Sequence, residues 1–291
     1  NVLAMLGKLG KKTAFIGKVG NDQFGNMLRN TIESVGIDAE GLVIDDKVHT
    51  TLAFVHTYPD GDRDFSFYRN PGADMMLRKE EVSLEKICAS KIFHFGTLSF
   101  THAGIRTASQ YAIQCAKEAG ALISFDPNLR EPLWENLEDA RKAIEYGMEC
   151  CDILKISDNE LTFMTGEKDY DKGAVLLQQK YQIPLVCVTL GKDGSRAYYK
   201  GLTIKAEPFL QKNTIETTGA GDTFTGCMLN TVLDKGLDNL TGEDIRGMLR
   251  FANAGAALIT TKRGALRVMP EKEEIEALLD CLLYTSPSPR D

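Results

Sequence analysis

The sequence has 291 residues, of which 43% are hydrophobic and 26% are charged, and its net charge at pH 7 is −7. Such a chain can bury a full core in one large domain or two, and it contains no apolar run of the roughly 18 residues that a membrane span needs. The acidic balance disfavours nucleic acid or an anionic membrane as the main partner, so we expect a small solute.

The beginning of the sequence already has helical periodicity, with apolar residues at Val2, Met5, Leu6 and Leu9. No methionine, capping residue or signal peptide precedes this pattern, so we expect the chain to be truncated at its N-terminus. A short strand and glycine turn over residues 13–20 follow, and then a helix that ends at Gly36.

Residues 50–58 and 63–68 are rich in β-forming residues and are joined by a strong turn signal at residues 59–62. This pattern predicts an antiparallel hairpin inserted at about residues 48–70. The period of two places Phe67 and Arg69 on one side of the second strand and Tyr68 on the other. An edge hairpin of the main sheet is the alternative.

From residue 91 onward, predicted strands alternate with predicted helices. The strands are at 92–95, 122–125, 153–155 and 185–189, and the helices are near 105–119, 137–148 and 172–181. A two-stranded element follows at 196–204. This alternation predicts an α/β fold whose mostly parallel, doubly wound sheet has helices on both faces, and ligands of such sheets bind beyond the carboxyl ends of the strands.

The stretch with the strongest functional signal is Glu216-Thr217-Thr218-Gly219-Ala220-Gly221-Asp222-Thr223-Phe224-Thr225-Gly226. Two glycines form a turn, and an apolar-periodic helix follows, so unpaired N–H groups and the positive end of a helix dipole face one spot. That arrangement suits a phosphate. Asp222 is either a base that accepts a proton from an attacking hydroxyl or an N-cap of the helix, and the local motif leaves both roles open.

The longer pattern resembles the C-terminal signature of the ribokinase/fructokinase (PfkB) family of sugar kinases. The resemblance implies that Gly219, Ala220 and Gly221 form the anion hole and that Asp222 is the catalytic base. Glu216 stands where the family usually has Asp, and the longer carboxylate keeps the negative charge beside a cation.

The resemblance also implies the residues that bind the sugar. Asn1 aligns with a sugar-contacting asparagine, and the hairpin with Phe67 and Arg69 corresponds to a lid that closes over the sugar. Arg130 ends an Asp-x-Asn-x-Arg element that begins at Asp126, and Arg69 and Arg130 are expected to bind the sugar or its transferred phosphate. From the residues alone, the arginine suits bidentate binding of a phosphate or carboxylate, and an Asx turn followed by a surface arginine is the alternative. A homodimer formed through the lid is a further expectation.

Glu160 occupies the Glu of the family's Asn-x-x-Glu element, where it organises Mg²⁺, although Ser157 replaces the Asn; a solvated glutamate at a helix start is the alternative. By resemblance, the nucleotide lies beside Thr189, Gly191, Gly194 and Asn253. The loop at 262–268 resembles one that holds a monovalent cation such as K⁺, but Val268 offers no side-chain oxygen there. The four histidines lack ligand spacing and are assigned to no metal.

The prediction is therefore an ATP- and Mg²⁺-dependent sugar kinase with a ribokinase-like fold, most similar to fructokinases. A 2-keto-3-deoxygluconate kinase, another sugar or nucleoside kinase of the family, and a catalytically silent sugar- or nucleotide-sensing protein are the alternatives. Gly17-x-x-Gly20 lacks the G-x-G-x-x-G spacing of a dinucleotide oxidoreductase. We expect one kinase domain at 1–282 without its first strand, and a non-native or disordered tail at 283–291. Seven cysteines without C-x-x-C spacing indicate reduced thiols and a cytoplasmic location.

Overall fold

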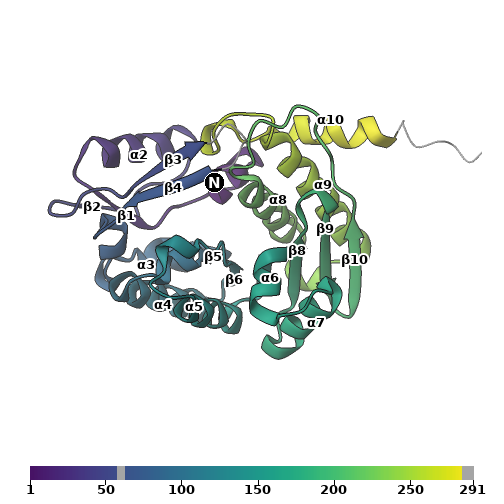
Figure 1. Ribbon diagram of the computed structural model, residues 1–291, viewed down its shortest axis with the longest axis horizontal. Coiled ribbons are helices and arrows are strands. Elements are labelled where there is room, and N and C mark those ends of the chain that lie inside the picture. Colours follow the sequence, from purple (N-terminus) through teal and green to yellow (C-terminus); the bar gives the residue numbers. More distant parts are fainter. Residues whose placement is uncertain (58–62, 284–291) are drawn as a thin grey trace, which may run out of the picture. The chain divides into compact units, whose positions relative to one another are not determined.

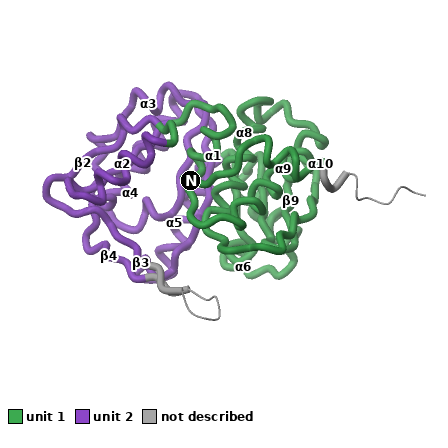
Figure 2. Tube along the Cα trace, turned by 90° about the horizontal axis from the view of Figure 1, so that it is seen from above, with its two compact units in different colours: residues 1–13, 35–37, 152–291 green, residues 14–34, 38–151 purple. Residues whose placement is uncertain are grey.

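A computed structural model describes residues 1–57 and 63–283, and for residues 55–57, 63–65 and 281–283 it describes the backbone alone. The predicted turn at 59–62 and residues 284–291 of the tail predicted at 283–291 lie outside the described residues, whereas Leu283 is the last residue of a helix. The chain divides into two compact units, shown in different colours in Figure 2. Unit 1 contains residues 1–13, 35–37 and the chain from 152 onward, and unit 2 contains residues 14–34 and 38–151.

Unit 2 alternates strands and helices, as the sequence predicts (Figure 1). Its strands are β1 (Gly17–Gly20), β2 (Leu42–Asp45), β3 (Leu52–Thr57), β4 (Arg63–Tyr68), β5 (Ile92–Gly96) and β6 (Leu122–Asp126). Its helices are α2 (Gln23–Ser34), α3 (Leu84–Ala89), α4 (Ala103–Glu118) and α5 (Leu137–Cys150). The pairs β1–β2 and β5–β6 are parallel, whereas β3 and β4 form an antiparallel hairpin.

The predicted hairpin is confirmed as strands β3 and β4, with Leu52 opposite Tyr68 and Thr57 opposite Arg63. The predicted division of β4 into two faces is also present, because Phe67 and Arg69 are half-buried while Tyr68 is exposed. The ring of Tyr68 meets that of Phe54 edge-on, with the centroids 5.4 Å apart. One face of the hairpin is therefore an exposed aromatic surface.

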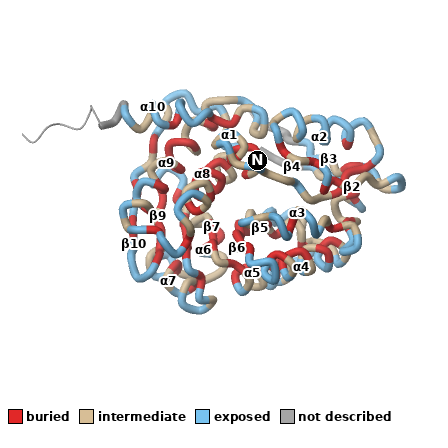
Figure 3. Tube along the Cα trace, turned by 180° about the vertical axis from the view of Figure 1, so that it is seen from behind, coloured by how far each residue is buried: buried red, intermediate tan, exposed pale blue. Residues whose placement is uncertain are grey.

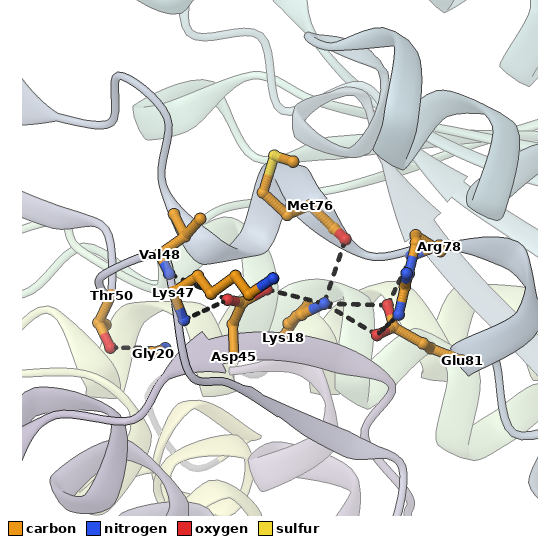
Figure 4. A network of polar contacts seen from close by, with 9 residues as sticks. All are labelled: Lys18, Gly20, Asp45, Lys47, Val48, Thr50, Met76, Arg78 and Glu81. Atoms are coloured by element: carbon orange, nitrogen blue, oxygen red, sulfur yellow. Dashed lines mark hydrogen bonds and ion pairs between the residues drawn. The ribbon is translucent and has the colours of Figure 1, made fainter.

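A buried lysine joins three segments of unit 2 (Figure 4). The Nζ of Lys18, on β1, lies 2.9 Å from a carboxylate oxygen of Asp45 on β2, and 2.9 and 3.0 Å from the two carboxylate oxygens of Glu81. The Lys18 ammonium, followed by the backbone N–H of Lys47, lowers the pKa of the Asp45 carboxyl to about 2. With two carboxylates around it, Lys18 has a structural role.

Unit 1 contains the remaining regular elements (Figure 1). Its helices are α1 (Val2–Lys8), α6 (Asp158–Thr165), α7 (Tyr170–Tyr181), α8 (Ala220–Lys235), α9 (Gly242–Ile259) and α10 (Lys272–Leu283). Its strands are β7 (Ile153–Ser157), β8 (Leu185–Thr189), β9 (Ser195–Tyr199) and β10 (Leu202–Ala206). Strand β7 pairs with β8 in parallel, and β9 pairs antiparallel with both β8 and β10.

The core of unit 1 forms around the apolar strands and helix α8, whose residues from Thr223 to Leu229 are all buried (Figure 3). Strand β8 is buried from Leu185 to Val188, the pattern of a strand covered on both faces. The six cysteines with described side chains are free thiols. Burial raises the pKa of the Cys187 thiol to about 12 and also raises the pKa of the Cys227 thiol, so both are inert core residues.

The predicted strands and helices are confirmed to within a few residues at most ends. Two short elements were not predicted, β2 with four residues and α3 with six, and only the start of α6 was indicated, at Glu160.

Candidate functional site

The glycine turn at residue 219 begins helix α8. Gly219 is the N-cap, with φ at 80°, a conformation that residues with a Cβ rarely adopt. The sequence left open whether Asp222 caps the helix; the structure excludes that role, because Asp222 is the third residue of α8 and no side chain caps the helix. The helix leaves the N–H groups of Gly221 and Asp222 without a carbonyl four residues back in the helix, so this end attracts anions.

Asp222 is hydrogen-bonded to Asn1, which lies 221 residues earlier in the chain. The side-chain amide of Asn1 donates to Oδ2 of Asp222 at 2.7 Å. Helix α1 approaches α8 closely because Gly226 has no side chain: a Cβ there would lie 2.6 Å from Cβ of Met5. The structure thus brings two of the predicted site residues together.

The segment before the glycine turn is bonded to the loop at 262–268. The backbone N–H of Gly264 donates to Oε1 of Glu216 at 2.6 Å, and a Cβ on Gly219 would lie 3.1 Å from Cβ of Ala265. The loop that resembles a cation-binding loop therefore contacts the glycine turn. Its side-chain carboxylate contact is Glu216, the residue at which this chain departs from the family pattern.

Lys155 was not identified from the sequence, yet it lies beside the glycine turn. A Cβ built on Gly221 would lie 3.1 Å from the Nζ of Lys155, whose residue is only 6% exposed. Lys155 is in the middle of the buried strand β7, where both neighbours, Leu154 and Ile156, are apolar. A lysine inside such a strand is rare, and that is the signal that could have identified it.

Glu160, the predicted magnesium residue, is buried at the start of α6. Its Oε2 accepts hydrogen bonds from the backbone N–H of Ser157 at 2.9 Å and from its hydroxyl at 2.8 Å, which completes a capping box. Ser157 thus orients the carboxylate that the sequence assigned to a cation. Among the described residues, no group of three or more His, Cys, Asp or Glu side chains is arranged to hold a metal.

The residues predicted to lie beside a nucleotide belong to the end of β8, the turn that follows it, and helix α9. Thr189 is the last residue of β8, and Gly191 and Gly194 in the turn have φ values of 54° and 83°. A Cβ on Gly194 would lie 2.2 Å from the carbonyl oxygen of Ala206, which also accepts a hydrogen bond from the side chain of Asn253 at 3.3 Å. The structure brings Gly194 and Asn253 together around the end of β10.

The predicted sugar-binding residues of unit 2 have protein partners. The guanidinium of Arg69 donates to Oδ2 of Asp74 at 2.6 and 2.8 Å and to the hydroxyl of Thr101 at 2.7 Å. Arg130 is exposed, and its side chain donates to the carbonyl of Leu129. Asp126 accepts from the N–H of Asn128 at 3.2 Å, so the predicted Asx turn is present. The sugar-binding roles of Phe67, Arg69 and Arg130 stay predictions.

Comparison with known proteins assigns the family. Residues 1–272 match the sequence profile of the pfkB family carbohydrate kinases. The chain belongs to this family. It is therefore a sugar kinase, and the resemblance seen in the sequence is confirmed. The protein named "Probable fructokinase-2" of Arabidopsis thaliana is 44% identical over 270 residues, which cover 93% of this chain and 82% of that protein.

Two solved fructokinase structures have the same fold. The Xylella fastidiosa fructokinase with bound ATP has a TM-score of 0.89 and 30% identity, covering 97% of this chain and 89% of that one. The Vibrio cholerae O395 fructokinase with fructose, ADP and calcium bound has a TM-score of 0.85 and 29% identity, covering 96% and 89%. The predicted α/β class with a mostly parallel sheet flanked by helices is confirmed. Within the described ranges, no helix is both long and apolar enough to cross a membrane.

Proposed function

We propose that this kinase phosphorylates a hydroxyl group of fructose with ATP and that the first turn of α8 is its catalytic centre. The observation that carries the proposal is Asp222, held by Asn1 at 2.7 Å in a helix start whose N-cap is a left-handed glycine. The choice of fructose is supported by the fructokinases among the relatives, one of which was solved with fructose bound.

The chemistry follows from the position of Asp222. Its carboxylate accepts the proton of the sugar hydroxyl while the hydroxyl oxygen forms a bond to the γ-phosphorus of ATP. The bond from that phosphorus to the β-phosphate oxygen breaks, and ADP leaves with the electron pair. The N–H groups of Gly221 and Asp222 stabilise the charge on the phosphoryl oxygens during transfer. Asn1 fixes the direction of the Asp222 carboxylate and contacts the sugar.

ATP and a divalent cation are supported as cofactors by the kinase family and by the ligands of its solved members. We propose Mg²⁺, organised by Glu160, because a carboxylate oxygen is the ligand type that this hard cation prefers. When bound, the cation neutralises charge on the phosphates of ATP. We also propose that Thr189, Gly191, Gly194 and Asn253 position the nucleotide, and that Glu216 with the 262–268 loop binds a monovalent cation such as K⁺.

The substrate assignment is tested by a panel of fructose, ribose, 2-keto-3-deoxygluconate and nucleosides, with ATP consumption as the readout. We expect fructose to give the highest kcat/KM. A clear preference for ketodeoxygluconate would favour the second candidate, because its acid group suits the two arginines, Arg69 and Arg130. If none of these acceptors supported ATP consumption, the result would favour a non-catalytic sensing protein instead.

The catalytic assignment is tested by Asp222→Asn. Asparagine keeps the shape of the side chain but cannot accept the proton, so we expect kcat to fall by roughly 10²- to 10⁴-fold with little change in Tm or ATP affinity. The matched control is Glu160→Gln, whose defect excess Mg²⁺ should partly relieve, whereas the Asp222→Asn defect should persist. Turnover of Asp222→Asn near the wild-type rate would remove the assignment.

Two expectations from the sequence remain proposals. A homodimer through the hairpin is supported by the exposed rings of Phe54 and Tyr68, which are 56% and 69% exposed. Sedimentation of the wild type against a Phe54→Ser/Tyr68→Ser double variant tests it, and an unchanged mass would exclude the hairpin as the interface. A cytoplasmic location is supported by the free thiols of the six described cysteines.

A further inference from the structure

We propose that Lys155 is a catalytic residue of this kinase and that its ammonium group binds the phosphoryl group during transfer from ATP to the sugar. The inference rests on the proposed function of the α8 start. It adds to that site a cation that neither the sequence motif nor the comparisons assign, and it names the chemical group that the cation contacts.

The first line of evidence is the position of the amine. The Nζ of Lys155 comes within 3.1 Å of the place where a Cβ of Gly221 would be, and the next atom of the side chain, Cε, within 3.8 Å. Among the described residues, no other heavy atom outside the helix and the neighbouring residues lies within 4 Å of that position. The lysine thus reaches the second residue of α8, whose N–H group belongs to the proposed anion hole.

The second line of evidence is the place of Lys155 in strand β7. Residues two apart share a face of a strand, so Lys155 is on the face of Ser157 and the opposite face carries Leu154 and Ile156. Ser157 is the residue whose N–H and hydroxyl hold the carboxylate of Glu160. One strand therefore presents both the lysine at the glycine turn and the support of the residue proposed to organise the cation.

Burial separates Lys155 from an ordinary surface lysine. The residue is 6% exposed, and a charged group in such a place is little screened by water. The weak screening means that the Lys155 ammonium acts strongly on negative charge that develops on phosphoryl oxygens next to Gly221.

In the transfer step, Lys155 neither gives nor takes a proton. The sugar oxygen forms its bond to the γ-phosphorus, the bond to the β-phosphate oxygen breaks with its electron pair going to ADP, and the sugar proton goes to Asp222. Lys155 donates N–H bonds to the oxygens of the moving phosphoryl group, which spreads their negative charge. Because the contact is strongest in the transition state, it should act on kcat rather than on KM.

The absence of a side chain at Gly221 now has a physical reason. Its φ is not in the left-handed region, and alanine is normally better than glycine inside a helix by roughly 1 kcal/mol, so local conformation alone does not require glycine. A methyl group there would press on the Nζ of Lys155 at 3.1 Å. Glycine leaves room for the amine beside the phosphoryl group.

The test is Lys155→Met, which keeps the length of the side chain and removes the charge, with Lys155→Arg as the conservative variant. We expect kcat with the preferred sugar to fall about 10²- to 10³-fold in Lys155→Met, with KM for ATP and sugar changed by less than about threefold. Affinity for ADP–aluminium fluoride in the presence of the sugar should fall by a similar factor, and Lys155→Arg should recover at least about tenfold in kcat. The matched control is Lys18→Met, at the second lysine that is buried among the described residues. This substitution should lower Tm and leave kcat per folded molecule unchanged.

A Lys155→Met enzyme that keeps its kcat within about threefold would overturn the proposal, as would one that loses ATP affinity without losing kcat. If Lys155→Met does not fold, Gly221→Ala gives the answer in the Lys155→Arg background. There the larger guanidinium should make the methyl group more harmful to kcat than in the wild type, and additive effects would refute the contact. Failure of the proposed function itself is separate, because it would appear as full activity in Asp222→Asn or no sugar phosphorylation by the wild type.

Discussion

The close approach of helices α1 and α8 depends on Gly226, and Gly226→Ala tests it. The new Cβ would lie 2.6 Å from Cβ of Met5, 2.8 Å from its Cγ and 3.1 Å from the carbonyl oxygen of Val2. Carbon atoms pack at about 3.5–4.0 Å, so α1 must move by about 1 Å. Inserting a methyl group into a packed core costs typically 1–3 kcal/mol, because side chains and backbone must shift.

The matched control is Gly247→Ala in α9, where a Cβ would meet no atom of the described part of the chain within 4 Å. Both substitutions gain the same helix propensity of roughly 1 kcal/mol, so their difference isolates the packing cost. We expect Gly247→Ala to be more stable than the wild type and Gly226→Ala to be less stable than Gly247→Ala by about 1–3 kcal/mol in urea unfolding. Because α1 carries Asn1 to Asp222, Gly226→Ala should also lower kcat/KM for the sugar. Equal stability of the two variants would refute the reasoning.

Three further outcomes are expected. Lys18→Met leaves Asp45 and Glu81 without their buried cation, so it should destabilise the protein by about 3 kcal/mol in thermal unfolding; a loss below 1 kcal/mol would mean that the network is dispensable. The pKa of Asp45 is about 2 when folded and close to 3.9 when unfolded, so its stabilisation is complete above about pH 4 and disappears as pH falls toward 2; the slope of stability against pH in that window should be shallower in Lys18→Met, and equal slopes would contradict the assignment. Asn253→Ala removes the donor to the carbonyls of Ala206 and Glu207 and should raise KM for ATP severalfold with kcat nearly unchanged, whereas an unchanged KM would separate this residue from the nucleotide.

Local signals explain why much of the fold was predictable. The alternating strands and helices from residue 92 onward have apolar periods that do not depend on distant residues, and the hairpin is marked by its β-rich runs. Gly219 is marked in the same way, because a left-handed N-cap favours glycine. The motif around Asp222 was therefore recognisable without a structure, and the family assignment agrees with it.

The roles of other predicted residues depended on contacts that no local pattern contains. Arg69 matches the end of a lid, yet its guanidinium is bonded to Asp74 and Thr101. Asn253 matches a position near a nucleotide, and its amide binds the carbonyls of Ala206 and Glu207, nearly 50 residues earlier. A side chain that can bind a ligand can equally bind the protein, and sequence spacing does not distinguish the two.

By itself, the sequence determined the order of strands and helices, the glycine turn and the aspartate that follows it. Only the tertiary structure decided that Asn1 donates to Asp222 and that Lys155 reaches Gly221. The physical reason is that periodicity and turn chemistry act over a few residues of chain, whereas these two contacts form because packing brings distant residues together. The partners are separated by 221 positions in the first contact and by 66 positions in the second. The close approach of α1 requires Gly226, where a Cβ would lie 2.6 Å from Cβ of Met5, so the first of these contacts needs space that a glycine far away in the sequence provides.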